Sequence, residues 1–117
     1  MNLRLSLIRF IPLGVALLIT RVPLTSAPIP SPTLEIHFKD HRFTPQKLAA
    51  PAGVPLVVKV VNESAERIEF ESFKLNREKV VEAGQTLVLH LPALKPGAFD
   101  FFDDFHSDVP EGEIRAQ

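Results

Sequence analysis

Cysteine is absent from the 117 residues, and the five glycines are scattered among turns. A chain without cysteine forms no disulfide, carries no thioether-linked lipid anchor and offers no thiolate to a metal ion. Isolated glycines do not build the glycine-rich loop that binds phosphate groups, and no serine stands in the context of a nucleophile beside a base. These absences argue against phosphate-loop enzymes and against serine or cysteine hydrolases.

Basic residues are few in the part of the chain that follows residue 27. Three of the 13 Lys and Arg precede residue 28, which leaves 10 basic residues against 14 acidic ones and a net charge of −4. Nucleic acids are bound by basic surfaces because their backbone is densely negative. We therefore expect no nucleic-acid partner.

Residues 1–27 have the pattern of a secretory signal peptide. Arg4 and Arg9 form a basic start, an apolar run continues to Thr20, and small residues precede Pro28. The apolar run is too short to span a membrane permanently. We expect export to the periplasm, with a cleavage position that Pro28 leaves uncertain by a residue or two. Retention as an uncleaved membrane anchor is the alternative.

The rest of the chain divides into a proline-rich linker, residues 28–33, and one domain, residues 34–117, which has room for a single core. Leu34, Ile36 and Phe38 alternate with polar residues, which is typical of a half-buried strand. Further segments with a strand pattern, separated by turn residues, are 47–50, 56–61, 67–71, 79–82, 86–91, 99–103 and 113–116. No long helical periodicity is present, so the pattern predicts an all-β antiparallel sandwich. The predicted core contains Phe38, Val58, Val60, Phe70, Leu89, Phe99 and Phe101.

The end of the strand at residues 99–103 is the first candidate for a functional site. An extended chain directs Phe99, Phe101 and Asp103 to one face, which places a carboxylate at the rim of the core. His106 follows three residues later and can turn back toward Asp103. An oxygen and an imidazole nitrogen at this rim suggest a metal site. The simpler interpretations are a solvated turn and a surface-loop histidine, but an unpaired buried carboxylate is costly.

The chain resembles the cupredoxins, the Greek-key sandwich of the blue-copper proteins, from Leu34 to Ala116. The matching features, in order, are Phe43-x-Pro45, the turn Pro51-Ala52-Gly53, Asn62 at the end of a strand, Pro96-Gly97 before an aromatic strand, and Gly112-x-Ile114. The resemblance implies the fold and the place of a metal site among its loops.

Set against the blue-copper ligands, the sequence departs from the family pattern. Asp103 occupies the cysteine position, His106 keeps a histidine position and Pro110 replaces the methionine. The earlier histidine ligand corresponds to Glu69 or Glu71; the spacing favours Glu69 without settling the choice, and both could equally be ordinary exposed strand residues. The resemblance therefore implies an iron or copper site of carboxylate and imidazole ligands and no blue-copper centre.

Two further groups of residues take a role from the resemblance. His41 lies in the loop between the first two strands, at the end of the fold that holds the metal, and is a possible extra ligand or an exposed hairpin histidine. His37 and His90 receive no role. The charged segment Asn76, Arg77, Glu78 and Lys79 is either an internal salt-bridged cap or a patch that docks a partner.

Residues 70–79 and 101–106 are similar to the cupredoxin-like component of bacterial periplasmic ferrous-iron uptake systems, and so to the N-terminal domain of EfeO-type proteins. This similarity implies two partners, a periplasmic iron- and copper-binding protein and an inner-membrane iron permease. It also implies a part in oxidising ferrous iron before transport. We expect at most an iron-oxidising component that works with a partner, as a monomer or weak dimer.

Two hypotheses about function follow. The first is an exported metal-binding protein of iron uptake. The alternative is a metal-free β-sandwich adaptor that docks a periplasmic partner or the permease. Metal content after purification distinguishes them.

Overall fold

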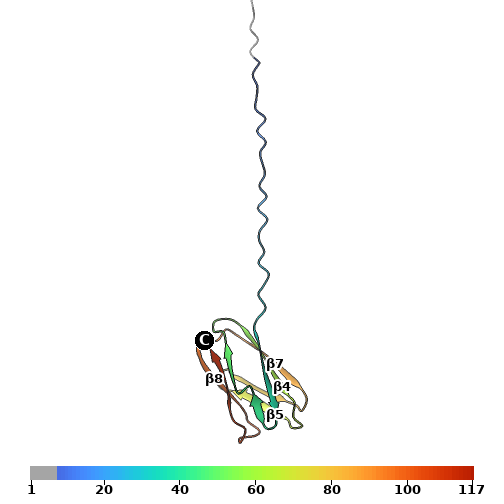
Figure 1. The fold of residues 1–117 in the computed structure, drawn as a ribbon, viewed down its shortest axis with the longest axis vertical. Coiled ribbons are helices and arrows are strands. Elements are labelled where there is room, and N and C mark those ends of the chain that lie inside the picture. Colours follow the sequence, from blue (N-terminus) through green and yellow to red (C-terminus); the bar gives the residue numbers. More distant parts are fainter. Residues whose placement is uncertain (1–7) are drawn as a thin grey trace, which may run out of the picture.

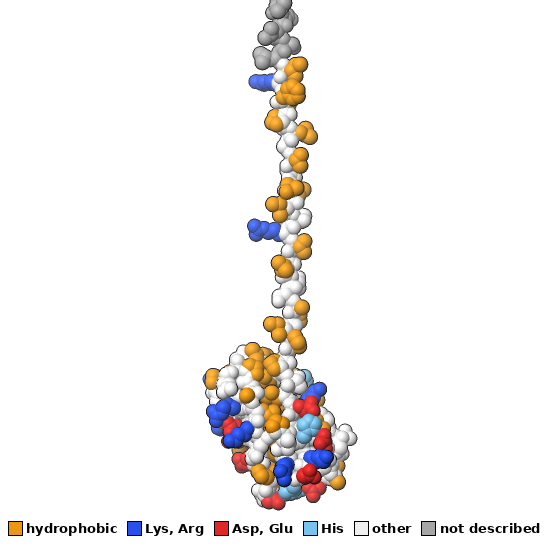
Figure 2. Space-filling model, in the orientation of Figure 1, with side chains coloured by type: hydrophobic (Ala, Val, Ile, Leu, Met, Phe, Trp, Pro, Cys, Tyr) orange, Lys and Arg blue, Asp and Glu red, His pale blue; other side chains and the backbone are white. Residues whose placement is uncertain are grey.

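A computed structural model describes residues 8–117 of the chain, so Arg4 and the rest of residues 1–7 of the predicted signal peptide lie outside the described residues. Residues 8–32 contain no helix or strand and run away from the domain as an exposed, extended segment (Figure 1). Apolar side chains are distributed along this segment (Figure 2). Nowhere in the described residues is there a helix with the length and apolar character needed to cross a membrane.

Nine strands make up the domain that follows. They are β1 (Thr33–Lys39), β2 (Arg42–Thr44), β3 (Lys47–Ala50), β4 (Leu56–Asn62), β5 (Ile68–Ser72), β6 (Arg77–Val81), β7 (Thr86–Leu91), β8 (Gly97–Asp103) and β9 (Gly112–Ala116). The short strand β2 was not expected, because residues 40–42 break the alternation. It forms because Asp40 and His41 both have positive φ, as a two-residue hairpin turn between paired strands requires.

The strands form two sheets, ordered β2-β1-β4-β7 and β3-β9-β8-β5-β6. The predicted all-β sandwich is confirmed. Most neighbouring strands are antiparallel, but β1 with β4 and β3 with β9 are parallel pairs. The first parallel pair arises because β3 lies in the other sheet: the chain leaves the first sheet after β2, and β4 re-enters beside β1 in the same direction. Side-chain alternation reports which face is buried and carries no information on strand direction.

The core lies between the sheets and is centred on an aromatic cluster. Phe101 stacks on Phe70 with ring centroids 5.3 Å apart, and Phe43 contacts Phe101 edge to face at 5.1 Å. Of the predicted core residues, Phe38, Val58, Val60, Phe70, Leu89 and Phe101 are buried. Phe99 is only half-buried and packs against the margin of the cluster. Phe43, which was not predicted, is buried because β2 brings it over the core.

We expect Gly112→Ala to destabilise the domain, because the Phe101 ring occupies the space of the missing side chain. A Cβ on Gly112 would lie 2.1 Å from Phe101 Cζ. Relief requires a shift of a fully buried ring, and overpacking of this kind costs roughly 1–3 kcal/mol. Chemical denaturation measures the effect. Gly53→Ala is not a suitable control, because Gly53 has a φ of +78°, which strains any other residue. The control is Ala98→Gly on the neighbouring strand β8, which also changes one methyl group but at a half-buried position.

Candidate metal centre at the hairpin end of the sandwich

Asp103 ends β8 and lies fully inside the protein. Its residue is 2% exposed, yet every carboxylate oxygen has a partner. Oδ1 accepts hydrogen bonds from the backbone N–H groups of Glu69 and Phe105, both at 3.0 Å. Oδ2 accepts from Nδ1 of His106 at 2.5 Å. Asp103 therefore joins β5, β8 and the following loop, and it fixes the orientation of the His106 ring.

The other nitrogen of His106 faces an acidic side chain. Nε2 lies 3.4 Å from Oε2 of Glu66, which belongs to the loop between β4 and β5. The hydrogen bond to Asp103 raises the pKa of His106 above its ordinary value, and the charges of Asp103 and Glu66 act in the same direction while burial opposes them. His106 thus lies between two carboxylates and exposes one nitrogen toward Glu66.

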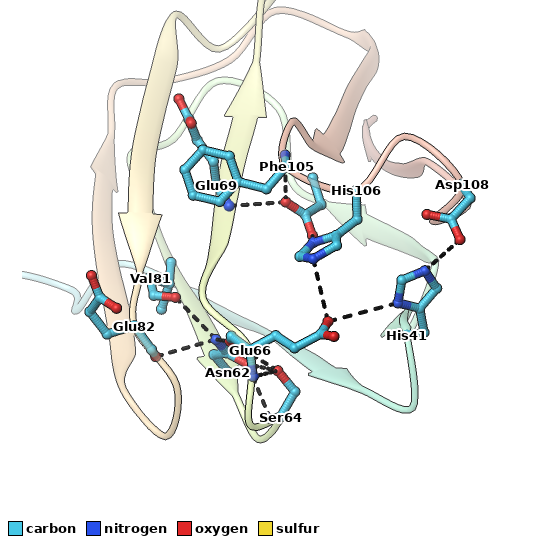
Figure 3. A network of polar contacts seen from close by, with 11 residues as sticks. His41, Asn62, Ser64, Glu66, Glu69, Val81, Glu82, Phe105, His106 and Asp108 are labelled. Atoms are coloured by element: carbon cyan, nitrogen blue, oxygen red, sulfur yellow. Dashed lines mark hydrogen bonds and ion pairs between the residues drawn. The ribbon is translucent and has the colours of Figure 1, made fainter.

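His41 approaches the same carboxylate from the β1–β2 hairpin. Its Nε2 lies 2.8 Å from Oδ2 of Asp108, and its Nδ1 lies 4.0 Å from Oε2 of Glu66. The hydrogen bond from His41 lowers the pKa of Asp108. The rings of His41 and His106 are 5.6 Å apart between centroids. Figure 3 shows both imidazoles directed at Glu66, each with a carboxylate behind it.

Buried Asn62 holds the loop that carries Glu66. Its Nδ2 donates to the backbone carbonyl of Glu66 at 2.7 Å and to that of Val81 at 3.0 Å. Its Oδ1 accepts from the backbone N–H and the hydroxyl of Ser64 at 3.1 and 2.6 Å. Asn62 is 0% exposed, and its bond to Val81 is fully buried while the bonds to Glu66 and Ser64 are partly buried. The residue that ends β4 therefore determines where Glu66 meets the histidines.

We call His41, Glu66 and His106, with Asp103 and Asp108 behind them, the histidine site. Of the residues expected at a metal centre, the structure brings together His106, Asp103 and His41. Sequence reasoning missed Glu66 and Asp108. A usable signal for Glu66 was its position four residues after the strand-ending Asn62, in the loop where the family places an early ligand. Asp108 carries no comparable signal in the sequence.

Glu69 and Glu71 belong to a different group of side chains. Figure 3 shows the carboxylate of Glu69 directed away from His106. Glu69, Glu71 and Asp104 each place one carboxylate oxygen within 4.8 Å of the others. Contact with the Glu78 carboxyl, partial burial and the charges of Glu78, Asp104 and Glu71 raise the pKa of Glu69 to about 7. We call Glu69, Glu71, Glu78 and Asp104 the carboxylate cluster.

The segment from Asn76 to Lys79 forms the last turn before β6 and the start of that edge strand. Asn76 has a φ of 53°, as a turn residue does. Arg77 donates to the backbone carbonyls of Leu75, Asn76 and His90, which ties β6 to β7. The ion pairs found within residues 8–117 do not involve this segment, so Arg77 acts here through backbone contacts. Partner docking by Asn76, Arg77, Glu78 and Lys79 stays a prediction.

Glu66 can share a metal ion with either histidine of the site, but His41, Glu66 and His106 do not place three donor atoms within 4.8 Å of one another, so a three-ligand site requires the side chains to move closer together. Ligand bonds of roughly 2.0–2.2 Å allow two donors of one ion to be up to about 4.4 Å apart. The separations of Glu66 Oε2 from the two histidine nitrogens, 3.4 and 4.0 Å, are within that limit. A carboxylate behind a ligand histidine is the usual means of orienting it. With no cysteine in the chain, a blue-copper site is excluded.

Comparison with known proteins agrees with this architecture. The sequence model of the family described as "Cupredoxin-like domain" matches residues 10–116. An uncharacterized protein of Rickettsia prowazekii (strain Madrid E) is 36% identical over 81 residues, which are 69% of this chain and 65% of the relative. The alignment thus leaves about a third of that relative unmatched.

Solved structures with the same fold have little sequence in common with the chain. Amicyanin from Paracoccus versutus is 16% identical with a TM-score of 0.59, covering 76% of this chain and 85% of amicyanin. Auracyanin A, a blue copper protein from Chloroflexus aurantiacus, is 12% identical with a TM-score of 0.60, covering 74% and 100%. A purple cupredoxin from Nitrosopumilus maritimus is 14% identical with a TM-score of 0.56, covering 71% and 98%. At such identities the likeness concerns the fold alone.

Proposed function

Because the chain belongs to the cupredoxin-like domain family, we propose that it binds a transition-metal ion at the histidine site and works in iron uptake after export. The observation that carries the proposal is the orientation of His106. Its Nδ1 is held by the buried Asp103, and its Nε2 is directed at Glu66. His41 has the same arrangement, with Asp108 behind it.

The donor set selects the kind of ion. Two imidazoles and one carboxylate suit Cu(II) or iron, whereas Cu(I) prefers the sulfur ligands that residues 8–117 lack. Asp103 is proposed as the residue that positions His106, since its oxygens are already engaged in three hydrogen bonds. Glu66 takes the ligand place that the resemblance gave to Glu69 or Glu71.

The role in iron uptake is supported by the resemblance of residues 70–79 and 101–106 to the cupredoxin-like component of ferrous-iron uptake systems. Under this proposal the protein is periplasmic and works with an iron- and copper-binding protein and an inner-membrane iron permease. Carboxylate and imidazole ligands favour the higher oxidation state of iron, so ferrous iron held at the site would give up one electron more readily to an acceptor that the partner supplies. Uptake of labelled iron by a strain that carries either wild type or His106→Ala tests this role.

We expect His106→Ala to weaken Cu(II) binding by ten-fold or more in isothermal titration calorimetry, because the variant removes a fixed ligand nitrogen. Bound Cu(II) should show no intense blue colour. His90→Ala is the matched control, since the His90 side chain is exposed and the contact with Arg77 uses the backbone carbonyl of His90, which the substitution retains. Equal Cu(II) affinity in wild type and His106→Ala would place the site elsewhere.

Cu(II) binding is also expected to depend on pH in a definite direction. A proton and a metal ion compete for Nε2 of His106, and Asp103 raises the pKa of this imidazole above its ordinary value of 6.5. Affinity should therefore increase as the pH rises through a midpoint above 6.5. A midpoint below 6.5, measured by titration calorimetry in several buffers, would contradict the contact with Asp103.

The metal-free adaptor remains the second candidate because of one observation. Phe73 is 78% exposed and its ring lies 5.3 Å from that of Phe102, which makes an aromatic pair accessible beside β5 and β8. Exposed aromatic side chains are enriched where proteins bind one another. A preparation that contains no metal and gains no stability from Cu(II) or iron would favour this role.

A further inference from the structure

We propose that the chain docks a basic segment of a partner protein at the outer face of the five-stranded sheet, with an arginine or lysine side chain of that segment against the rings of Phe73 and Phe102. We call Phe73, Phe102, Asp100 and Glu111 the aromatic–acidic patch. The inference rests on the docking role kept above as the second candidate, to which it adds the chemistry of the partner, and it requires no metal ion at the histidine site.

Phe73 is exposed, yet the turn that carries it is fixed by hydrogen bonds. This turn joins β5 to β6, and in it the backbone N–H of Asn76 donates to the carbonyl of Phe73 at 3.1 Å. The hydroxyl of Ser72, a residue with 0% exposure, accepts from the backbone N–H of Leu75 at 3.2 Å. The Phe73 ring also packs against that of Phe102. An exposed ring that is already held in place loses little freedom on binding, so Phe73 is suited to be an anchor.

Two open hollows flank the ring of Phe73. One has a volume of about 180 Å³ and is lined by Phe73, Lys74, Asp100, Phe102 and Glu111. The other has a volume of about 290 Å³ and is lined by Phe73, Glu71, Ser72, Asn76, Arg77 and Glu78. Both hollows contain acidic side chains. An extended segment that crosses Phe73 can therefore place one side chain in each.

The acidic side chains around Phe73 have no basic partner among residues 8–117. The ion pairs found there involve neither Asp100 nor Glu111 nor Glu71. Lys74 lines the first hollow, but its Nζ donates to the carbonyl of Ala98 at 3.1 Å. The charge of the hollows is thus negative, and it is complementary to a basic segment.

Glu71 connects the aromatic–acidic patch with the carboxylate cluster. On one side Glu71 is the cross-strand partner of Phe102, and on the other side it is the partner of Glu78. Burial and the charges of Asp104 and Glu78 raise the pKa of Glu71. A cationic side chain bound beside Phe102 would offset the repulsion among these acids, so docking of a basic segment is favoured over docking of a neutral one.

Phe105 shows the expected contact within the chain itself. Cζ of Arg67 lies 5.3 Å from the centre of the Phe105 ring, which is the geometry of a cation–π interaction. Within residues 8–117 no such contact is recorded for Phe73 or Phe102. Their rings are therefore open to a cation from another molecule.

The test uses as its probe a fluorescein-labelled synthetic peptide of alternating arginine and glycine, with binding measured by fluorescence anisotropy at low ionic strength. We expect wild type to bind this peptide and Phe73→Leu to bind it about five-fold more weakly or worse, the factor for one lost cation–π contact of about 1 kcal/mol. Phe105→Leu is the matched control, because Arg67 already occupies that ring. It should bind like wild type, whereas a peptide of alternating glutamate and glycine should not bind.

A second pair of variants separates local from overall charge. Asp100→Asn with Glu111→Gln should also weaken binding of the arginine peptide about five-fold or more. Asp40→Asn with Glu82→Gln removes the same charge from exposed positions that line neither hollow, and it should bind within about two-fold of wild type. All these positions except the Phe73 ring lie outside aromatic contacts, and all are exposed, so thermal unfolding should be close to that of wild type in every variant.

The proposal is overturned if wild type does not bind the arginine peptide or if Phe73→Leu binds it equally. It is also overturned if the two double variants lose the same affinity, because binding would then follow net charge alone. A dimer of wild type that Phe73→Leu dissociates in sedimentation velocity would assign the face to a second copy of the chain and overturn it as well. Phe73→Leu should bind Cu(II) like wild type and His106→Ala should bind the peptide like wild type, so failure here is distinguishable from failure of the metal site.

Discussion

Phe101→Ala is expected to lower the free energy of unfolding by roughly 3–5 kcal/mol, the range for removal of a buried aromatic ring. Phe101 is 0% exposed and contacts the rings of Phe43 and Phe70, so the lost ring leaves a cavity between the two sheets. A domain of this size has about 5–15 kcal/mol of stability in total. The variant should therefore be close to unfolded at room temperature in moderate urea.

Urea denaturation followed by circular dichroism measures this effect. Phe73→Ala is the matched control, because it deletes the same ring at a position that is 78% exposed. We expect its midpoint to remain near that of wild type. If Phe101→Ala and Phe73→Ala shifted the midpoint equally, the core would not be organised around Phe101.

The second large effect is expected for Asp103→Ala, which should cost about 3–5 kcal/mol, because each buried donor left without its acceptor costs about 1–3 kcal/mol. The substitution leaves the backbone N–H groups of Glu69 and Phe105 and the Nδ1 of His106 without their shared acceptor. It also releases the His106 ring, so Cu(II) binding should weaken together with stability. Asp100→Ala, at an exposed position of the same strand, should change neither.

Asp103→Asn separates the two consequences. The amide oxygen can still accept from the two backbone N–H groups, so we expect most of the stability to return. The amide nitrogen, however, presents a donor to Nδ1 of His106, which favours the tautomer protonated on Nε2. Nε2 is the nitrogen that faces Glu66, so Cu(II) affinity should stay low. If Asp103→Asn bound Cu(II) as well as wild type, Asp103 would not be the residue that orients His106.

The sequence was sufficient to predict the strands and the buried face of most of them. Leu34, Ile36 and Phe38 alternate with polar residues, and a period of two identifies a half-buried strand wherever it is placed in the fold. The inward direction of Asp103 and its reach to His106 were also predictable, because both depend on residues at most three apart. Local geometry determines these features.

Only the tertiary structure determined the parallel pairing of β1 with β4 and the burial of Phe43. It also determined which acidic residues belong to the histidine site and which to the carboxylate cluster. Glu66 and Asp108 are 42 residues apart and reach the same site only because the β4–β5 loop, the β1–β2 hairpin and the segment after β8 meet at one end of the sandwich. Glu69 and Glu71 lie on the same face of β5. The neighbouring strands β6 and β8 determine which side chains they contact on that face. Alternation tells which face a side chain occupies, whereas its neighbours on that face come from other strands and are determined when the sheets assemble.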